Sequence, residues 1–389
     1  MRALHFLPVW EPAWQFGGPV KSVGRLCEAL AAQGVGVEVI TTTAGLTDWP
    51  AEQTGVPLLR RGVSVTYYPV DQPTGAIRSQ ALLADLPRRL QGVNLLHLSA
   101  IWQPLGPAVQ RLAAAAGVPV IASLRGALGP YSFSRGAWKK WPYYWLVERP
   151  LLLRAAALHI TSAQESDELR RWPLALSPQV PRRWLLPNPL DPLCFAEPFA
   201  SAEPPSVQRQ LLVCGRHHHK KGLDLLAPVL AGLDDQPWQL LLVGPDQDGS
   251  AAALQRQLAR RGLASRLSCL PLQSGADLTA LFQRADLLLM PSRHENFGNV
   301  ALEALACACP VLVSQAVGAA ADLERVMAAE PWGAVLPRRV AAWQGWLRQW
   351  FLEPRRRPSP EPLRAYAGST AVAERCVQAY QRLLAGKAP

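Results

Sequence analysis

Short apolar runs alternate with amphipathic stretches along most of the chain. The runs are rich in Val, Leu and Ile and have the length of buried strands. In the first half of the chain they are ALHFLPV from residue 3, VEVITT from 37, LLHLSA from 95, VIASLRG from 120, ALHITSA from 157 and WLLPNP from 184. This alternation predicts a parallel sheet with helices between its strands.

The same alternation resumes in the second half, so we predict two similar α/β domains. Its runs are LLVCGR from 211, LLLVGP from 240, RLSCLP from 266, ADLLLMP from 285, VLVSQA from 311 and GAVLP from 333. The prolines of residues 187–207 exclude both a helix and a central strand. The prediction is an N-terminal domain over 1–190, a linker over 191–207 and a C-terminal domain over 208–365.

The last segment, residues 366–389, is expected to be a separate amphipathic helix. Its apolar residues Val372, Cys376, Tyr380 and Leu383 share one stripe. Such a stripe has to dock on another part of the protein. The full length of 389 residues suits two domains better than one.

The composition excludes several classes of protein. Apolar residues make up 49% and charged residues 18%, which excludes a disordered chain. The longest apolar runs are strand-sized, so no membrane-spanning helix is expected. MRALHFLPVWEP has no cleavage site and is interpreted as a first strand, which predicts a cytoplasmic protein. The seven scattered cysteines contain no CxxC pair and are expected to be buried or incidental thiols.

A formal net charge of +11 suggests an anionic partner. Nucleotide phosphates, phospholipid headgroups and nucleic acid would all fit this charge. The basic residues are dispersed and no nucleic-acid-binding fold is recognised, so we expect no nucleic-acid partner.

The densest chemical signal is PSRHENFGNVALEALACACPVLVS, which predicts a strand, a polar loop and a helix that begins near Gly298. The free backbone N–H groups at such a helix start attract phosphate. They belong to Phe297, Gly298, Asn299 and Val300. Two carboxylates, Glu295 and Glu303, flank this position, and their suitable partners are sugar hydroxyls. The alternative is an ordinary helix start with two solvated carboxylates.

A second signal follows the strand LLVCG. Arg216 and Lys221 lie five residues apart across a loop, and an arginine fork with a lysine charge suits a diphosphate. Gly215 and Gly222 allow the backbone to approach a ligand closely. The alternative is a solvated basic loop.

Two further patterns resemble metal sites but are interpreted otherwise. His217, His218 and His219 cannot all face one ion on a regular element, and no acidic residue adjoins them in the sequence. Asp246 and Asp248 follow a strand directly, within a run typical of turns. We therefore expect a loop and no metal.

Together with the loop at Gly17, Gly18 and Pro19, these segments resemble the retaining glycosyltransferases of family 4, the group of glycogen synthase-like and phosphatidylinositol mannosyltransferase-like enzymes. The resemblance spans nearly the whole chain. It rests on the GGP loop, SLRGALGP at 123–130, LLPNPLD around Asn188, GRxxxxKG at 215–222 and ENFGNVALE at 295–303.

The resemblance implies the α/β GT-B fold, in which two Rossmann-like, doubly wound domains face a cleft and the C-terminal helix crosses back to the N-terminal domain. Arg216 and Lys221 would neutralise the donor diphosphate, Glu295 would bind the donor sugar and Glu303 the ribose. The loop and helix start at Gly215, Asn296, Phe297, Gly298, Asn299 and Val300 would complete the donor site. Gly17 and Gly18 would meet the donor phosphates.

Arg125 departs from the pattern, because many relatives have a histidine at this place. An arginine cannot accept a proton, and it would instead donate to a hydroxyl or a phosphate. It is included among the predicted catalytic residues together with Arg216, Lys221 and Glu295.

The expected reaction is transfer of a sugar from a nucleotide sugar to an acceptor hydroxyl without a metal or other cofactor. Retention at the anomeric carbon is implied by the resemblance alone. The acceptor is expected to be a saccharide or lipid-linked, in the synthesis of a cell-envelope polysaccharide, lipopolysaccharide or glycolipid. The alternatives are another GT-B enzyme, such as a nucleotide-sugar epimerase, and a basic nucleic-acid-binding protein.

Residues 133–156 suggest where the enzyme works. Five large aromatic residues, Trp138, Trp141, Tyr143, Tyr144 and Trp145, stand beside the cations Arg135, Lys139, Lys140 and Arg149. This composition is typical of a segment at a membrane surface, here the inner face of the cell membrane. Pro142 is expected to split it into a loop and a helix. The alternative is a helix that packs its aromatic residues into the core.

Overall fold

A computed structural model describes residues 1–134, 136–171, 181–195, 208–328 and 333–386. The chain divides into two compact units, each with its own sheet and its own apolar cores. Unit 1 comprises Met1–Pro189 and Ser369–Pro389, and unit 2 comprises Leu190–Gly368. Most of the predicted linker, residues 196–207, lies outside the described residues.

Unit 1 is built on an eight-stranded sheet. Its strands are Arg2–Val9 (β1), Gly36–Thr42 (β2), Pro57–Arg60 (β3), Val63–Tyr68 (β4), Leu95–Leu98 (β5), Val120–Ser123 (β6), Ala157–Ile160 (β7) and Arg182–Leu185 (β8). Their order is β3-β4-β2-β1-β5-β6-β7-β8, and all neighbours are parallel except the antiparallel edge pair β3–β4. Parallel strands of this kind are covered on both faces, and β5, β6 and β7 are buried along their whole length.

Helices cover both faces of this sheet. They are Gly18–Ala32 (α1), Gln80–Arg89 (α2), Leu105–Ala115 (α3), Pro130–Ser134 (α4), Ala137–Tyr143 (α5), Arg149–Arg154 (α6), Ala163–Arg171 (α7) and Ser369–Leu384 (α15). On β1, Ala3 and Leu7 belong to the core that includes α1 and α15. Leu4 and Phe6, which alternate with them, belong to the core that includes α2 and α3.

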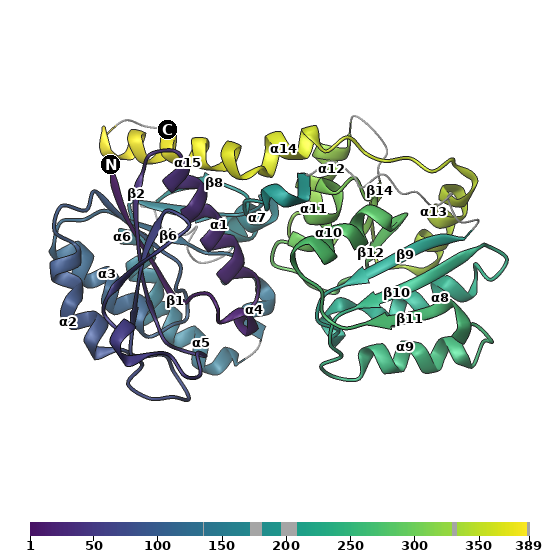
Figure 1. Ribbon diagram of the computed structural model, residues 1–389, viewed down its shortest axis with the longest axis horizontal. Helices are drawn as coiled ribbons and strands as arrows, with labels where there is room; N and C mark the ends of the chain where they lie inside the picture. Colours follow the sequence, from purple (N-terminus) through teal and green to yellow (C-terminus); the bar gives the residue numbers. More distant parts are fainter. Residues whose placement is uncertain (135, 172–180, 196–207, 329–332, 387–389) are drawn as a thin grey trace. The chain divides into compact units, whose positions relative to one another are not determined.

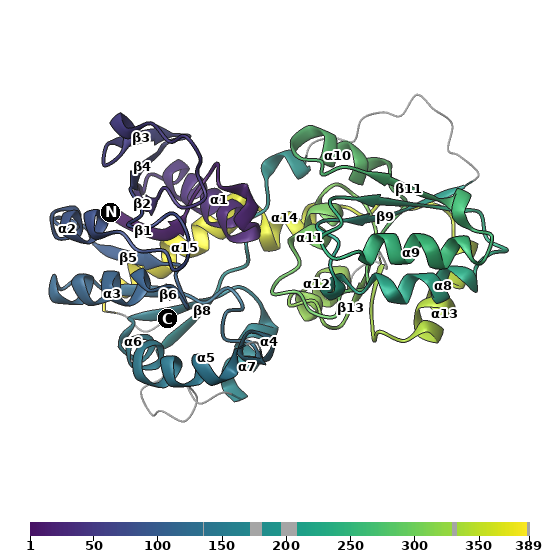
Figure 2. The same ribbon diagram turned by 90° about the horizontal axis from the view of Figure 1, so that it is seen from below.

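The predicted C-terminal helix packs on unit 1. It begins at Ser369 and buries Val372, Cys376 and Tyr380 on the stripe that the sequence indicated. It lies along α1 in Figures 1 and 2, and the two helices are in contact. The chain therefore returns to its first domain at its end, as the GT-B fold requires.

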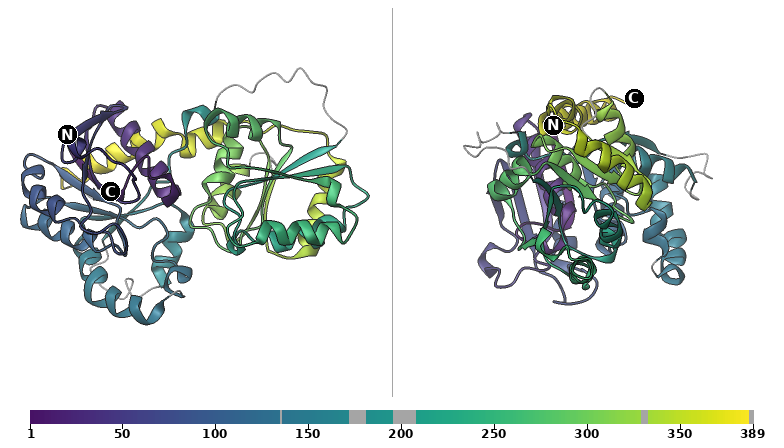
Figure 3. Two further views of the ribbon diagram at one scale, coloured as in Figure 1. Left: turned by 60° about the horizontal axis from the view of Figure 1, so that its bottom comes forward. Right: turned by 90° about the vertical axis from the view of Figure 1, so that its right-hand side faces the viewer.

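The aromatic segment forms a helical run in place of the expected loop and helix. Helix α5 continues into a π-helical turn, Tyr144–Glu148 (η3), and then into α6, with Pro142 inside α5. The prediction that Pro142 splits the segment is therefore wrong, because the helical backbone continues past it through the wider π turn. The run packs on the sheet face opposite α15, as Figure 3 shows.

Unit 2 has a six-stranded sheet in which every paired strand is parallel. The strands are Arg209–Cys214 (β9), Trp238–Val243 (β10), Leu267–Leu270 (β11), Leu287–Met290 (β12), Val311–Ser314 (β13) and Gly333–Leu336 (β14). Their order, β11-β10-β9-β12-β13-β14, is that of a dinucleotide-binding Rossmann fold. The order reverses between β9 and β12, where such sheets bind ligands at the carboxyl ends of their strands.

Two sets of helices enclose the unit 2 sheet (Figure 1). The helices are Leu226–Ala231 (α8), Ser250–Ala259 (α9), Gly275–Arg284 (α10), Asn299–Ala306 (α11), Ala320–Met327 (α12), Val340–Leu352 (α13) and Glu361–Ala367 (α14). One core includes α8, α9 and α13, and the other includes α11, α12 and α14. The two cores bury the central strands β12 and β13 along their whole length, while the edge strand β11 is mostly exposed.

Two broader expectations can be compared with the structure. In the described part of the chain, no helix combines the length and apolar character needed to cross a bilayer. All seven cysteines are free thiols, and only Cys269 is exposed.

Candidate active site

The two strongest sequence motifs meet at the point where the strand order of unit 2 reverses. GRHHHKKG follows β9, ENFGNVALE follows β12, and these two strands are neighbours in the sheet. The sheet topology therefore places the predicted phosphate-binding loop beside the predicted sugar-binding loop.

Backbone contacts fix the two loops against each other. The Arg293 N–H donates to the Lys220 carbonyl at 2.7 Å. Gly222 has φ +67°, and a Cβ there would lie 2.1 Å from the Pro291 carbonyl oxygen, so only glycine fits this approach. Arg338 donates from Nε to the same Pro291 oxygen at 2.7 Å and from Nη2 to the Gly222 carbonyl at 3.3 Å.

The predicted phosphate and sugar ligands form an ion pair across these loops. The Lys221 Nζ donates to Glu295 Oε1, and each side chain is 21% exposed. Arg216, five residues before Lys221, is exposed. The site thus pairs one cationic side chain with a carboxylate, and the same loop carries Arg216 as a second, exposed cation, a combination that suits a diphosphate attached to a hydroxyl-bearing group.

The loop that carries Glu295 is held in place by the connection between β13 and α12 and by the buried Phe297 side chain. Its backbone pairs with the β13–α12 connection, where the Glu295 N–H donates to Ala316 O at 3.1 Å and the Gly318 N–H donates to Glu295 O at 2.9 Å. The Phe297 side chain is buried in the unit 2 core. Phe297 therefore serves as an anchor, and only its backbone can contribute to binding.

Helix α11 begins beside this loop, as predicted. Its N-cap is Gly298 at φ +99°, a residue that has no side chain with which to cap the first turn. The first N–H groups of a helix have no partner within the helix, so Asn299 and Val300 present donors at this end. Glu303 lies in the middle of α11 and is half-buried, while Asn296 is exposed in the loop.

In unit 1 the predicted residues lie near the strand ends of the first sheet. Gly17 has φ +83° and caps the start of α1, where Gly18 is the first helical residue. Arg125 follows β6 with φ +49°, and its Nη1 donates to Ser22 Oγ at 2.9 Å and to Asn188 Oδ1 at 2.7 Å. Burial lowers the pKa of the Arg125 guanidinium to about 10. These contacts make Arg125 a link between α1 and the Asn188 segment, and its role toward a donor stays a prediction.

Some residues that build the sites carry no motif in the sequence. Arg338 follows β14 and reaches the predicted phosphate-binding loop, more than a hundred residues away in the sequence, at Gly222 and Asp224. In unit 1, Glu165 accepts from the Gly126 N–H at 2.5 Å and the Thr161 N–H at 2.6 Å, and so fixes the loop after Arg125. Only the fold brings these residues to their partners.

The interpretation of the histidine run needs one correction. No acidic residue adjoins His217, His218 and His219 in the sequence, but the fold brings Asp248 beside two of them. Because His218 is extended and His219 starts a one-turn helix, the two rings can both turn toward Asp248. The loop interpretation of Asp246 and Asp248 is confirmed, since both carboxylates accept backbone N–H groups at the start of α9.

Comparisons with known proteins agree with this geometry. Residues 17–183 match the glycosyl transferase 4-like domain, and residues 176–347 match the family 4 glycosyltransferase of conflict systems. GDP-mannose:cellobiosyl-diphosphopolyprenol alpha-mannosyltransferase of Xanthomonas campestris is 28% identical over 320 residues, which cover 78% of this chain and 76% of that protein. D-inositol 3-phosphate glycosyltransferase of Jonesia denitrificans is 28% identical over 378 residues, 90% of this chain and 86% of that protein.

Solved structures show the same fold. Sucrose-phosphate synthase from Thermosynechococcus elongatus has a TM-score of 0.73 at 23% identity and covers 99% of this chain and 100% of that one. Anabaena HepE in complex with UDP has a TM-score of 0.74 at 17% identity and covers 98% and 100%. The two sequence matches together run from residue 17 to 347. The chain therefore belongs to the family 4 glycosyltransferases and has the GT-B fold, with two Rossmann-like parallel-sheet domains.

Proposed function

We propose that this glycosyltransferase moves a sugar from a nucleotide-diphosphate sugar to an acceptor hydroxyl with retention at the anomeric carbon and without a metal. The observation that carries this proposal is the Lys221–Glu295 ion pair at the reversal point of the unit 2 sheet. It joins a phosphate-binding cation to a carboxylate suited to sugar hydroxyls in one place.

The chemistry follows from these side chains. The bond between the anomeric carbon and the donor phosphate oxygen breaks, and a bond from that carbon to the acceptor oxygen forms. Negative charge accumulates on the departing diphosphate, where Arg216, Lys221 and the start of α11 stabilise it. The acceptor proton passes to the departing phosphate oxygen. Glu295 holds donor-sugar hydroxyls and Glu303 holds the ribose.

The acceptor class is inferred from the relatives. The Xanthomonas enzyme is named for a GDP-mannose donor and a diphosphopolyprenol-linked acceptor, and a similar fold, WaaG, is involved in lipopolysaccharide biosynthesis. We infer a lipid-linked or saccharide acceptor in cell-envelope synthesis for this chain. The donor base and sugar are left to experiment.

The experiment that tests the function compares donors with and without acceptor. UDP- and GDP-sugars are screened for thermal stabilisation, because a ligand at 100 times its Kd adds about 2.7 kcal/mol. Turnover of the stabilising donor is then followed with lipid-linked and soluble saccharide acceptors. A new glycoside whose anomeric configuration matches the donor supports the proposal. Conversion of the donor without any acceptor would indicate an epimerase, and an inverted product would remove the retaining mechanism.

Metal independence gives a separate prediction. Turnover is expected to persist in excess chelator, since Arg216, Lys221 and the helix start supply the positive charge that a metal supplies in other folds. The rate is measured before and after dialysis against chelator, and again after Mg²⁺ or Mn²⁺ is added back. Complete inhibition that these ions reverse would assign a metal to the reaction.

We further propose peripheral attachment to the inner face of the cell membrane through the helical run α5–η3–α6. Its exposed side carries Trp138, Trp145 and Leu146, which are 76%, 43% and 78% exposed, next to the exposed Lys139. Tyr144 is buried and Trp141 packs against the core. The aromatic residues therefore divide between the core and an exposed face suited to lipid headgroups.

The inner side of the run is firmly anchored, which keeps the exposed face in place. The Glu148 carboxylate accepts from the Trp102 N–H at 2.9 Å, and burial raises its pKa to about 7. Lys140 Nζ donates to the Ser132 carbonyl, so this lysine is also part of the fold. Arg135 lies outside the described residues.

Vesicle sedimentation is expected to show binding that requires anionic lipid and weakens with salt. The double variant Trp138→Ala, Leu146→Ala should reduce the bound fraction, and Lys139→Glu should reduce it in anionic vesicles. Leu59→Ala is the matched control, because Leu59 is 79% exposed on β3 of the same unit. Equal recovery in the supernatant with neutral and anionic vesicles at low salt would indicate an enzyme that works away from the membrane.

A further inference from the structure

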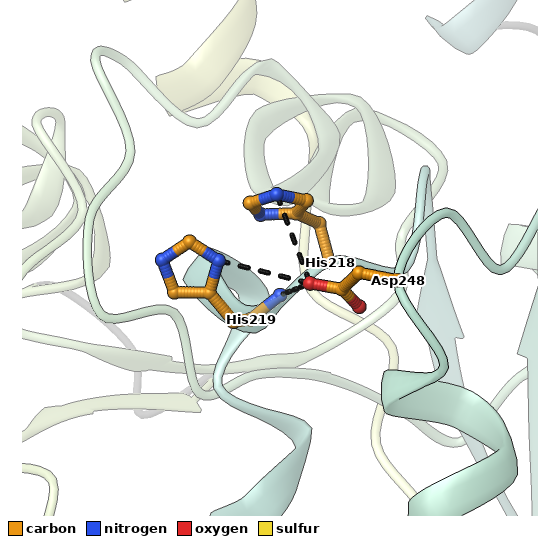
Figure 4. A group of neighbouring side chains, drawn as sticks. All are labelled: His218, His219 and Asp248. Atoms are coloured by element: carbon orange, nitrogen blue, oxygen red, sulfur yellow. Dashed lines mark hydrogen bonds and ion pairs between the residues drawn. The ribbon is translucent and has the colours of Figure 1, made fainter.

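Beside the phosphate loop, three potential metal ligands converge from two connections of unit 2. His218 and His219 follow β9, and Asp248 follows β10 (Figure 4). Backbone pairing fixes the two connections in register: the His217 N–H donates to Pro245 O at 2.8 Å and the Gln247 N–H donates to His217 O at 2.9 Å. The three side chains therefore meet because the backbone holds their loops together.

The separation of the ligand atoms suits a small ion. His218 Nε2 and His219 Nδ1 each lie 3.7 Å from Asp248 Oδ2, and all three ligand atoms lie within 4.8 Å of one another. A tetrahedral Zn²⁺ with bonds of about 2.0–2.1 Å separates its ligand atoms by about 3.4 Å. Both distances to the carboxylate are close to that value, and a small rotation of the two rings would close the third edge.

The carboxylate is already oriented and ionised. Asp248 Oδ1 accepts from the Ser250 hydroxyl and N–H, and Oδ2 accepts from the His219 N–H at 2.7 Å. These hydrogen bonds, led by that from the Ser250 side chain, lower the pKa of Asp248 to about 2. An anionic oxygen held in this way is the outer support that metal-binding carboxylates have in proteins.

We propose that His218, His219 and Asp248 bind one divalent transition-metal ion of the zinc class, with water completing its coordination. Two imidazoles and a carboxylate are ligands that Zn²⁺ prefers, and an open position suits the exposed setting. To coordinate through Nε2, His218 carries its proton on Nδ1 and gives up the hydrogen bond from the Lys220 N–H. That bond is long, at 3.4 Å, so little opposes the change.

The ion would strengthen the phosphate loop from outside without taking part in transfer. The Lys221 N–H donates to His218 O at 2.7 Å, so an ion that holds His218 also holds the backbone that presents Lys221. The same loop is fixed by its bonds to Pro245 and Gln247 without any ion. The inference is therefore compatible with transfer in excess chelator, and it does not depend on the proposed reaction.

The test uses the full-length protein without a histidine tag, stripped with chelator and titrated with ZnCl₂ in a calorimeter. One ion per chain is expected, together with a rise in Tm that chelator reverses. His219→Ala and Asp248→Asn should each weaken binding at least tenfold and abolish the rise in Tm. Co²⁺ in place of Zn²⁺ should give visible absorption that the same variants lose.

Matched controls separate this cluster from unspecific surface binding. His294→Ala removes a histidine outside the cluster in the same unit, and Asp235→Asn removes an exposed carboxylate paired with Arg348. Both controls should bind Zn²⁺ like the unaltered protein. Circular dichroism verifies that every variant is folded. Equal zinc affinity in His219→Ala, Asp248→Asn and the unaltered protein, or no binding by the unaltered protein, would overturn the proposal.

Discussion

Lys221→Ala is expected to lower kcat/KM for the nucleotide sugar by about 10²- to 10³-fold while the fold stays intact. Removing one preorganised charge donor at a developing anion typically costs this much. The substitution also leaves the Glu295 carboxylate without its cationic partner, facing the position proposed for the diphosphate. Both effects act on the bound diphosphate, so the loss in kcat/KM should exceed the loss from removing a neighbouring surface charge.

The control for this prediction is Lys220→Ala, which removes the adjacent, half-buried lysine of the same loop. Its turnover should stay within a few-fold of the unaltered enzyme. Glu303→Ala should lose most transfer as well, mainly through weaker donor binding. Steady-state kinetics and the Kd of the free nucleoside diphosphate are measured for each variant. Turnover at the original rate in Lys221→Ala would show that this loop does not bind the donor phosphates.

The order of elements was predictable because parallel α/β proteins repeat one simple signal. Each of the twelve apolar runs named from the sequence overlaps a strand of the correct sheet. The hairpin of β3 and β4 was not predicted. Its first strand alternates between exposed and half-buried residues, and the turn depends on left-handed backbone at Arg61 and Gly62. An edge strand with one solvent-exposed face has no continuous apolar run in its sequence.

The candidate site was predictable to the extent that its residues lie close together in the sequence. Spacing placed Glu295 before α11 and Glu303 inside it, and the structure adds that Glu295 pairs with Lys221. Contacts between distant segments gave no such signal. Asp248 reaches the histidines only because β9 and β10 are neighbours, and Arg338 reaches the phosphate loop only through β14 and the fold.

Because three histidines are buried in unit 1, we predict a second large effect: the free energy of unfolding of this unit falls in acid. His5, His97 and His159 lie on β1, β5 and β7, and each is 1% exposed. Their rings are 4.9 and 5.1 Å apart, with His97 Nε2 3.0 Å from His159 Nδ1. His97 Nδ1 also lies 2.6 Å from the Tyr380 hydroxyl, which joins α15 to the sheet. Protonation would therefore place several charges together in the core.

The direction of the effect follows from the pKa values. Burial, reinforced by the positive charge of Arg125, lowers the pKa of His5 and of His159 to about 3, and burial lowers that of His97 well below its ordinary value. Each histidine thus has a folded pKa below its unfolded value of about 6.5. The stability it contributes is present above pH 6.5 and is lost as the pH falls toward 3, because the unfolded chain binds protons that the folded chain excludes.

The size of the loss is comparable with the whole stability of a domain. At pH 4.5, two units below the unfolded pKa of about 6.5, each histidine removes about 2.7 kcal/mol from the free energy of unfolding. The three together remove about 8 kcal/mol, which lies within the total of about 5–15 kcal/mol that holds a domain folded. Denaturant unfolding at pH 7, 5.5 and 4.5 should show a steep decline, and pepsin at pH 4.5 should cut first within residues 1–189.

His5→Leu separates the histidines' contribution to the loss of stability in acid from the contribution of the carboxylates. His5 makes the longest hydrogen bond of the group, 3.5 Å to the Tyr380 hydroxyl, so replacing it disturbs the network least. The variant should lose about a third of the histidine-dependent decline between pH 6.5 and 4.5, whatever its stability at pH 7. The comparison uses the slope of the unfolding free energy against pH, because a change in packing alters that free energy by the same amount at every pH. An unchanged slope in His5→Leu would mean that the histidines are not excluded from protonation, and that other groups unfold the protein in acid.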